Sequence, residues 1–244
     1  MKLILAGYGK MARMIAELLR PREDVEILGM VHPGLFDSPF DVPGKPDAIV
    51  DFSYPGNLEN VLARAEDAQA AVVIGTTGYT SEQIAAIRAA SEHVPIVHSS
   101  NYSLGVAVLR RALKSVGPLL LEAGFDAEIV EAHHNQKADA PSGTAKALLS
   151  AIDPDGDYAR VCGREGFAGA RGREIGVHAV RGGTEAGEHR VCFFGNNELL
   201  EFRHQAATRR VFAAGAVKAL DFAVGRAPGL YTVDDVLGLT NSKH

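Results

Sequence analysis

The sequence predicts an α/β protein with a doubly wound, Rossmann-type parallel-sheet domain and an α+β domain with a mixed or antiparallel open sheet. Two observations carry this prediction. Over the first hundred residues, short continuous apolar runs alternate with helical segments, which is typical of parallel strands buried on both faces. After residue 170, three apolar runs follow one another with only turn residues between them, which indicates a second type of sheet.

Five strands are expected in the first domain, each one a short apolar run. They cover residues 2–7, 25–31, 47–52, 70–75 and 95–100. Helices are expected between them at 10–20, 55–66 and from Thr80 to Ser91. Thr80 and Gln83 have the spacing of a capping box, in which each side chain bonds to the backbone of the other residue, so this helix has a marked start.

The second half of the chain begins with a long amphipathic helix expected at 103–122. A strand at 125–134, a helix at 143–152 and a loop rich in glycine and arginine at 153–173 follow. Three strands are then expected at 174–180, 188–194 and 198–204. The turn residues Gly182-Gly183 and Asn196-Asn197 separate them, which predicts an antiparallel meander. A helix at 209–225 ends the pattern.

Composition excludes several classes of function. The 244 residues carry a net charge of −5 and an isoelectric point near 6.0, which argues against a nucleic-acid-binding protein. Only Cys162 and Cys192 occur, without metal-ligand spacing, so we expect no metal site and reduced thiols. No apolar run reaches about 18 residues, and the run after Lys2 is too short for a signal peptide. We therefore expect a cytoplasmic protein without a membrane segment.

A dinucleotide-binding fingerprint follows the first expected strand. Gly7-Tyr8-Gly9-Lys10-Met11-Ala12 matches G-x-G-x-x-G/A at the start of the first helix. Gly7 permits the tight turn and Gly9 lets the backbone approach a pyrophosphate, while the helix N-terminus presents N–H groups to the phosphates. Within a βαβ pattern, this fingerprint predicts a bound dinucleotide.

The preferred dinucleotide stays open between NADH and NADPH. An acidic residue that accepts from the ribose usually follows the second strand, but His32 stands there and the first carboxylate is Asp37. Lys10 or His32 could bind the 2′-phosphate of NADPH, but each could equally be a solvent-exposed side chain without a ligand. The loops at 75–78 and 99–103 follow the fourth and fifth strands and are expected to face the nicotinamide. The Tyr102 ring is suited to packing against it, or to ordinary core packing.

The stretch EAHHNQKADAPSGTA at residues 131–145 is the densest in chemically active side chains. Two histidines and Lys137 stand just before Pro141-Ser142-Gly143-Thr144, which has the composition of a helix start. A helix start presents N–H groups and here two hydroxyls, a combination suited to a carboxylate. Proton carriers and a cation beside an anion receptor indicate chemistry on a small carboxylated substrate.

These residues resemble the signature E-x-H-H-x-x-K-x-D-x-P-S-G-T-A of the 4-hydroxy-tetrahydrodipicolinate reductases, also called dihydrodipicolinate reductases, of bacterial lysine biosynthesis. The resemblance extends over essentially the whole chain. It includes the glycine loop and, in the same order, DFSYPGNL, GTTG, SSNYSLGV, REG, VRGGTEAGEH and LYTVDDVLGL. It implies NADPH- or NADH-dependent reduction of a cyclic dicarboxylate to tetrahydrodipicolinate, without a metal.

The resemblance also implies a role for individual positions. Lys137 would donate a proton after hydride transfer, with His133 assisting. The substrate carboxylate would be held by His134, Ser142, Gly143 and Thr144. The cofactor would be bound by Gly7, Gly9, Lys10, Met11, Gly75, Thr77, Asn101 and Tyr102. The resemblance also implies a homotetramer. The family's nucleotide domain is discontinuous and would comprise residues 1–102 and 210–244 here, with 103–209 as the substrate-binding and oligomerisation domain.

Three departures from the family pattern lie on the nucleotide side. The glycine loop is shorter and lacks a final glycine, His32 replaces an acid, and Tyr54 stands where an arginine is frequent. Two alternatives remain open from the residues alone. A Rossmann oxidoreductase acting on a linear substrate would explain the glycine loop but not the 131–145 stretch. A non-catalytic nicotinamide sensor would bind the cofactor without turnover.

Overall fold

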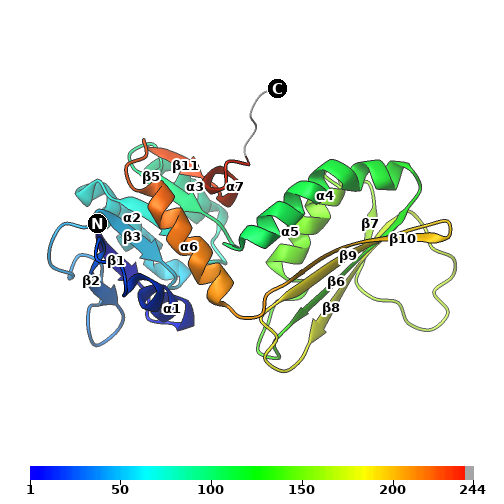
Figure 1. Cartoon of the computed structure of the whole chain (residues 1–244), viewed down its shortest axis with the longest axis horizontal. Coiled ribbons are helices and arrows are strands. Elements are labelled where there is room, and N and C mark those ends of the chain that lie inside the picture. Colours follow the sequence, from blue (N-terminus) through cyan, green and yellow to red (C-terminus); the bar gives the residue numbers. More distant parts are fainter. Residues whose placement is uncertain (240–244) are drawn as a thin grey trace. The chain divides into compact units, whose positions relative to one another are not determined.

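The structure is a computed structural model that describes residues 1–239, and it divides the chain into two compact units. Unit 1 comprises Met1–Leu104 together with the chain from Arg210 onward, and unit 2 comprises Gly105–Arg209. The family resemblance implied divisions after residues 102 and 209, whereas unit 1 extends here to Leu104. Figure 1 shows unit 1 in blue, cyan, orange and red, and unit 2 mainly in green and yellow.

Unit 1 contains a six-stranded parallel sheet with the strand order β11-β5-β4-β3-β1-β2. The strands are β1 (Lys2–Ala6), β2 (Glu26–Val31), β3 (Ala48–Asp51), β4 (Ala71–Ile74), β5 (Pro95–His98) and β11 (Gly229–Tyr231). The helices are α1 (Lys10–Leu19), α2 (Leu58–Ala68) after a 3₁₀ turn, α3 (Ser81–Ala90), α6 (Arg210–Ala223) and α7 (Val233–Val236). Chain order runs outward in opposite directions from β1, so the sheet is doubly wound, as expected.

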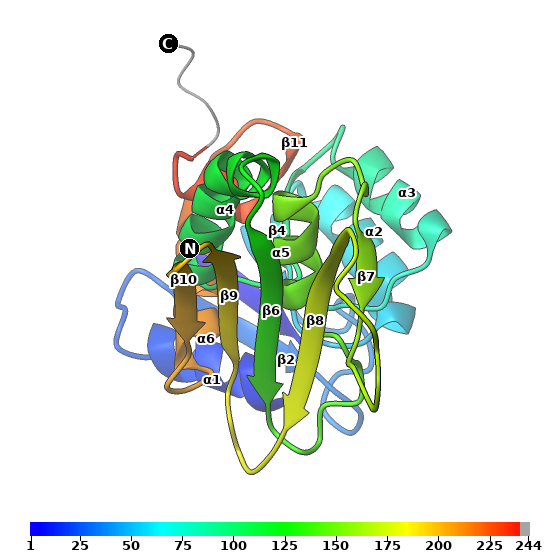
Figure 2. The same cartoon turned by 90° about the vertical axis from the view of Figure 1, so that its right-hand side faces the viewer.

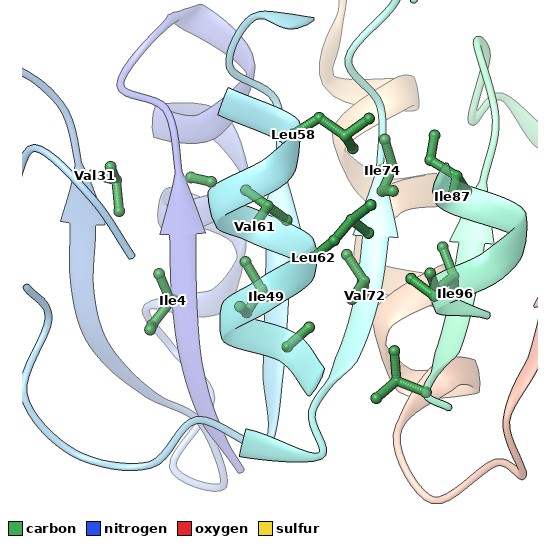
Figure 3. Close-up of a cluster of buried hydrophobic side chains, with 14 of the residues drawn as sticks. Ile4, Val31, Ile49, Leu58, Val61, Leu62, Val72, Ile74, Ile87 and Ile96 are labelled. Carbon is green, nitrogen blue, oxygen red and sulfur yellow. The ribbon is translucent and has the colours of Figure 1, made fainter. Parts of the chain in front are cut away.

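The core of unit 1 explains why its strands are continuous apolar runs. Strand side chains such as Ile49 and Val72 are completely buried beneath Val61 of α2 and Ile87 of α3 (Figure 3). The other face of the sheet is equally buried, because Leu3 and Leu5 have no exposed surface either. A parallel sheet covered on both faces needs apolar residues at consecutive positions instead of alternate ones.

Unit 2 contains a five-stranded mixed sheet with the strand order β10-β9-β6-β8-β7, seen face-on in Figure 2. The strands are β6 (Asp126–His133), β7 (Ala159–Val161), β8 (Glu174–Arg181), β9 (Glu188–Gly195) and β10 (Glu198–Gln205). Helices α4 (Leu104–Glu122) and α5 (Gly143–Ile152) cover one face, where Leu113 and Leu148 pack against Ile129 and Phe193. Alternate residues of β6 therefore point into this core.

The predicted antiparallel meander is wrong in its first step. β8 and β9 are consecutive in the chain but do not pair, because β6 lies between them, parallel to β8 and antiparallel to β9. Only β9 and β10 form a hairpin, with Asn197 in the left-handed conformation at φ 62°. Turn residues indicate that the chain reverses, but they do not show whether the two flanking strands pair or enclose a third strand.

Three short elements were not expected from the sequence. β7 lies within the stretch 153–173 that was predicted to be a loop, and β11 and α7 follow the last predicted helix. The two strands have only three residues each and no hydrophobic alternation that could identify them. The capping box of Thr80 and Gln83 is confirmed, with both reciprocal hydrogen bonds present. Among residues 1–239, no helix is long and apolar enough to cross a membrane.

Candidate active site

The glycine loop lies where β1 ends, beside the carboxyl ends of β2 and β3. A pocket of about 250 Å³ opens there, lined among others by Gly7, Tyr8, Gly9, His32 and Ser53. Gly7 has a φ of +107°, and a Cβ atom at this position would be 2.6 Å from the carbonyl oxygen of Phe52. Only glycine fits this turn, because any side chain would combine backbone strain with a collision against the backbone of Phe52, the residue after β3.

The start of α1 has the properties of a phosphate-binding helix N-terminus. Gly9 caps the helix without a side-chain hydrogen bond, and no acidic residue stands in the first turn. No atom lies within 4 Å of the position that a Gly9 Cβ would occupy, so the backbone is open to a close approach. Lys10 is exposed and Met11 half-buried in the first turn of the helix. These features fit the pyrophosphate of a dinucleotide.

His32, the residue after β2, forms an aromatic pair with Tyr8 of the glycine loop. The rings of Tyr8 and His32 lie 4.2 Å apart between centroids, and the guanidinium of Arg13 lies over the Tyr8 ring at 5.5 Å. Asp37, which is distant from the glycine loop in sequence, lines the same pocket. The pocket therefore combines a carboxylate, an imidazole and the rings of Tyr8, Phe52 and Tyr54 where the ribose and adenine of a dinucleotide are expected.

A buried carboxylate organises the loops that follow β3 and β4. Asp51 has no exposed surface and accepts hydrogen bonds from the Ser53 amide (3.0 Å), the Ser53 hydroxyl (2.5 Å) and the Tyr79 hydroxyl (3.0 Å). The Ser53 amide also donates to the Thr76 hydroxyl at 2.9 Å. Burial raises the pKa of Asp51, and these hydrogen bonds only partly oppose the effect. The network joins the two loops at the carboxyl edge of the sheet.

The remaining predicted cofactor residues follow β4 and β5 at this edge. Gly75 is half-buried against the Phe52 ring, and Thr77 is exposed. The Asn101 carboxamide accepts from the Ser103 amide at 2.8 Å. The Tyr102 ring is in the core, 2% exposed, and its hydroxyl donates to the backbone of Ile74 and Val97. Of the two alternatives given by the sequence, Tyr102 therefore has the one in which its ring packs in the core, and not the one in which it lies against the nicotinamide.

In unit 2, the predicted catalytic stretch is organised by Glu131 on β6. Its carboxylate has no exposed surface, and each oxygen accepts two hydrogen bonds. Oε1 accepts from the Ser142 amide at 3.0 Å and from Arg181 at 2.8 Å. Oε2 accepts from Arg181 at 2.8 Å and from Nδ1 of His133 at 2.5 Å. Burial alone would raise the pKa of Glu131, but these donors outweigh it and lower the pKa below its ordinary value.

Burial favours the neutral form of His133. Its pKa lies below the ordinary value of 6.5, mainly because of burial, although the bond to Glu131 acts in the opposite direction. The ring lies edge-on to His189 at 5.2 Å between centroids. Its Nε2 faces Gly187, where a Cβ would be 3.1 Å away, so a glycine keeps this nitrogen uncovered. The uncovered nitrogen is a hydrogen-bond acceptor when Nδ1 carries the proton.

Lys137 lies on the loop between β6 and α5. Its Nζ is 2.8 Å from Asp139 Oδ1, and its side chain is 21% exposed. Backbone hydrogen bonds from His134 to Glu185 and from Asn135 to Gly183 hold the start of this loop against the β8–β9 connection. The loop geometry therefore depends on a segment that is far from it in sequence.

The helix start predicted at Ser142 is confirmed as the N-terminus of α5. The Ser142 hydroxyl accepts from the Ala145 amide at 3.1 Å and lies 3.2 Å from Nε2 of His189. This hydroxyl is buried and belongs to the helix cap, so its role toward a substrate carboxylate stays a prediction. Gly143 and Thr144 form the first turn, where the helix dipole favours an anion and no acidic side chain opposes it.

Sequence reasoning missed Glu131, Arg181 and His189 as parts of this site. Glu131 had a usable signal, since it precedes His133 by two residues on a strand and therefore shares its face. Arg181 and His189 had none, because only the register brings them together: Arg181 stands opposite His133, and His189 opposite Glu131. Within residues 1–239, no group of three or more His, Cys, Asp or Glu side chains is arranged to hold a metal ion.

His189 gives the site a measurable dependence on pH. It is 3% exposed, and burial lowers its pKa from 6.5 to about 4. A base with a depressed pKa in the folded state stabilises that state above pH 6.5, and this contribution is lost as pH falls toward 4. At most about 3 kcal/mol is at stake over this range.

We therefore expect the free energy of unfolding to fall less steeply between pH 6.5 and 4 in His189→Gln than in the unsubstituted protein. Urea unfolding at half-unit pH intervals measures both slopes. Parallel slopes for the two proteins would show that His189 titrates in the folded state as it does in the unfolded chain.

Comparison with known protein families assigns both units. Residues 1–102 match the model described as "Dihydrodipicolinate reductase, N-terminus", and residues 105–237 match "Dihydrodipicolinate reductase, C-terminus". A dipicolinate-bound dihydrodipicolinate reductase from Paenisporosarcina sp. TG-14 has a similar fold, with a TM-score of 0.73, 23% identity and coverage of 95% of this chain and 97% of that chain.

Two relatives are similar over nearly their whole length, and both are named 4-hydroxy-tetrahydrodipicolinate reductase. The protein from Brachyspira hyodysenteriae is 40% identical over 239 residues, covering 97% of this chain and 100% of its own length. The protein from Methanoregula boonei is 40% identical over 254 residues, covering 98% of each chain. With both family models matched in order along one polypeptide, the chain belongs to the dihydrodipicolinate reductase family.

Proposed function

We propose that the protein reduces 4-hydroxy-tetrahydrodipicolinate to tetrahydrodipicolinate with NADPH or NADH, in the biosynthesis of diaminopimelate and lysine. The observation that carries this proposal is the arrangement in unit 2, in which His133 and the start of α5 both bind Glu131 and Lys137 lies on the loop that joins them. The names of the relatives agree with it, and so does the dipicolinate bound to the similar structure.

The cofactor would be held by the glycine loop and the start of α1, with Gly75, Thr77 and Asn101 beside its nicotinamide. Once bound, a reduced nicotinamide supplies a hydride to the substrate ring. The task of the protein is then to bind the dicarboxylate, to neutralise the charge that the ring gains, and to deliver a proton. Lys137 serves the last two needs, because an ammonium group near the ring stabilises negative charge and carries a proton.

The substrate carboxylates would be bound by His134 and by the first turn of α5. His134 follows the last residue of β6, and its Nδ1 accepts from the Gln136 amide at 3.2 Å. The Gly143 and Thr144 backbone belongs to the positive end of the α5 dipole. Neutral His133 would act as a hydrogen-bond partner at Nε2 and assist the proton transfer from Lys137.

The test of the reaction is a coupled assay. Pyruvate and aspartate semialdehyde are supplied with dihydrodipicolinate synthase, and the loss of reduced-nicotinamide absorbance is followed separately with NADH and NADPH. We expect oxidation that depends on the synthase, and the ratio of the two rates gives the cofactor preference. Binding of either cofactor without synthase-dependent oxidation would contradict the proposal and favour a sensor.

Lys137→Gln tests the assignment of the proton donor. General acid catalysis is typically worth about 10²- to 10⁴-fold, so we expect kcat to fall by at least about 100-fold while KM changes much less. Steady-state kinetics in the same assay measure both constants. Lys114→Gln on the exposed side of α4 is the matched control and should retain the original rate. A rise in KM with kcat unchanged would make Lys137 a binding residue only.

We further propose that the protein is a cytoplasmic homotetramer associating through the sheet face of unit 2 that α4 and α5 leave uncovered. Both cysteines are unpaired, which suits a reducing compartment. Phe194 and Leu199 face each other across the β9–β10 hairpin and are 44% and 55% exposed. Val180 on β8 is 51% exposed. Exposed apolar side chains on a sheet face that no helix covers indicate an association surface.

Light scattering coupled to gel filtration tests this assembly. We expect a mass near four times 25.9 kDa for the unsubstituted protein and a smaller mass for Leu199→Glu, because the charge would be buried at the interface. Leu119→Glu, at a 63% exposed position on α4, should retain the tetramer. A monomer at micromolar concentration would refute the assembly without affecting the assigned reaction.

A further inference from the structure

The carboxylate of Glu131 fixes which ring nitrogen of His133 carries a proton. An ionised carboxylate only accepts hydrogen bonds, and Glu131 already accepts from Arg181 at both oxygens and from the Ser142 amide. The nitrogen of His133 at 2.5 Å from Oε2 must therefore be a donor. Nδ1 carries the proton, and Nε2 on the other side of the ring is left with its lone pair.

The same carboxylate also determines the path of the loop that carries Lys137. Its Oε1 accepts a hydrogen bond from the amide of Ser142, the residue at the end of the loop. Its Oε2 binds His133, the residue directly before the loop. Arg181 extends the control to the middle of the loop, since its guanidinium bridges Glu131 and the carbonyl oxygen of Asp139 at 2.7 Å. Glu131 thus contacts the beginning and the end of the segment from His133 to Ser142 directly, and it reaches Asp139 within the segment through Arg181.

We propose that Glu131 is a positioning residue of the reduction, which holds His133 with its proton on Nδ1 and its Nε2 available as an acceptor, and which fixes the loop bearing Lys137. The inference rests on the proposed function, because it assigns Glu131 a role in that reaction. Its structural content is independent of any activity: the tautomer of one histidine is set by one carboxylate.

Glu131→Gln has a predictable effect on this arrangement. The amide group brings one NH₂ into a place where an oxygen accepted hydrogen bonds. At the Oε1 place the NH₂ would meet the Ser142 amide, which can only donate. At the Oε2 place it meets His133, whose ring can move its proton to Nε2 and accept at Nδ1. Arg181 donates at both places and so does not distinguish between them. The amide nitrogen should therefore face His133 and reverse its tautomer.

The experiment is a two-bond ¹H–¹⁵N correlation spectrum of full-length protein with ¹⁵N-labelled histidine at pH 7.5, which distinguishes the two neutral tautomers. A His133→Asn sample identifies the signals. We expect His133 to be protonated at Nδ1 in the unsubstituted protein and at Nε2 in Glu131→Gln. In the coupled assay, Glu131→Gln should lower kcat by at least about tenfold with KM within about threefold, because the acceptor at Nε2 is lost.

Glu128→Gln is the matched control. Glu128 is also on β6 and also binds a histidine and arginines, since its carboxylate contacts His178, Arg164 and Arg171. It lies on the opposite face of the strand, so this substitution should leave the tautomer of His133 unchanged. A reversal of the His133 tautomer in Glu128→Gln would show a general loss of order in β6 and would overturn the specific role of Glu131.

The remaining outcomes separate the inference from the proposed function. Protonation of His133 at Nε2 in the unsubstituted protein overturns the role of Glu131 whatever the activity, and this measurement does not depend on the folding of Glu131→Gln. An unchanged tautomer or an unchanged kcat in folded Glu131→Gln overturns it as well. If the tautomer reverses as expected but the unsubstituted protein oxidises neither cofactor, the proposed reaction fails and the assignment of the His133 tautomer stands.

Discussion

The buried carboxylate of Glu131 is the constraint on which the rest of unit 2 depends. A charge without exposed surface is costly unless donors surround it, and here four hydrogen bonds from three residues do so. Those residues come from β6, β8 and the start of α5. Because each must be in place for the charge to be tolerated, the carboxylate couples the position of the helix N-terminus to the register of the sheet.

Unit 1 uses the same physical solution at its own functional edge. Asp51 is the last residue of β3, has no exposed surface, and collects hydrogen bonds from Ser53 and Tyr79. In both units, a carboxylate near the carboxyl end of a strand fixes loops to which the proposed function assigns the binding of cofactor or substrate. Irregular loops lack the repeated hydrogen bonds of helices and strands, so one buried acceptor of several donors is an economical way to order them.

The parts of the fold that sequence predicted are those with a local signal. Thr80 and Gln83 define a helix start through contacts three residues apart, and the strands of unit 1 are recognisable because burial on both faces requires continuous apolar runs. The meander failed because pairing is not local: β6 inserts between β8 and β9, which are joined by a short connection. The three-residue strands β7 and β11 are too short to carry a pattern.

The sequence by itself determined the two kinds of sheet, the glycine turn, the chemically active stretch from 131 to 145 and, through resemblance, the family. Each depends on residues that are adjacent or a few positions apart, so the local amino-acid sequence is sufficient to identify it. Tertiary structure decided which side chains complete the site. Arg181 follows Glu131 by 50 residues, and it reaches the carboxylate only because β8 pairs with β6 in one register. That register is set by the burial of one sheet face against α4 and α5, a property of the assembled core and not of any segment alone.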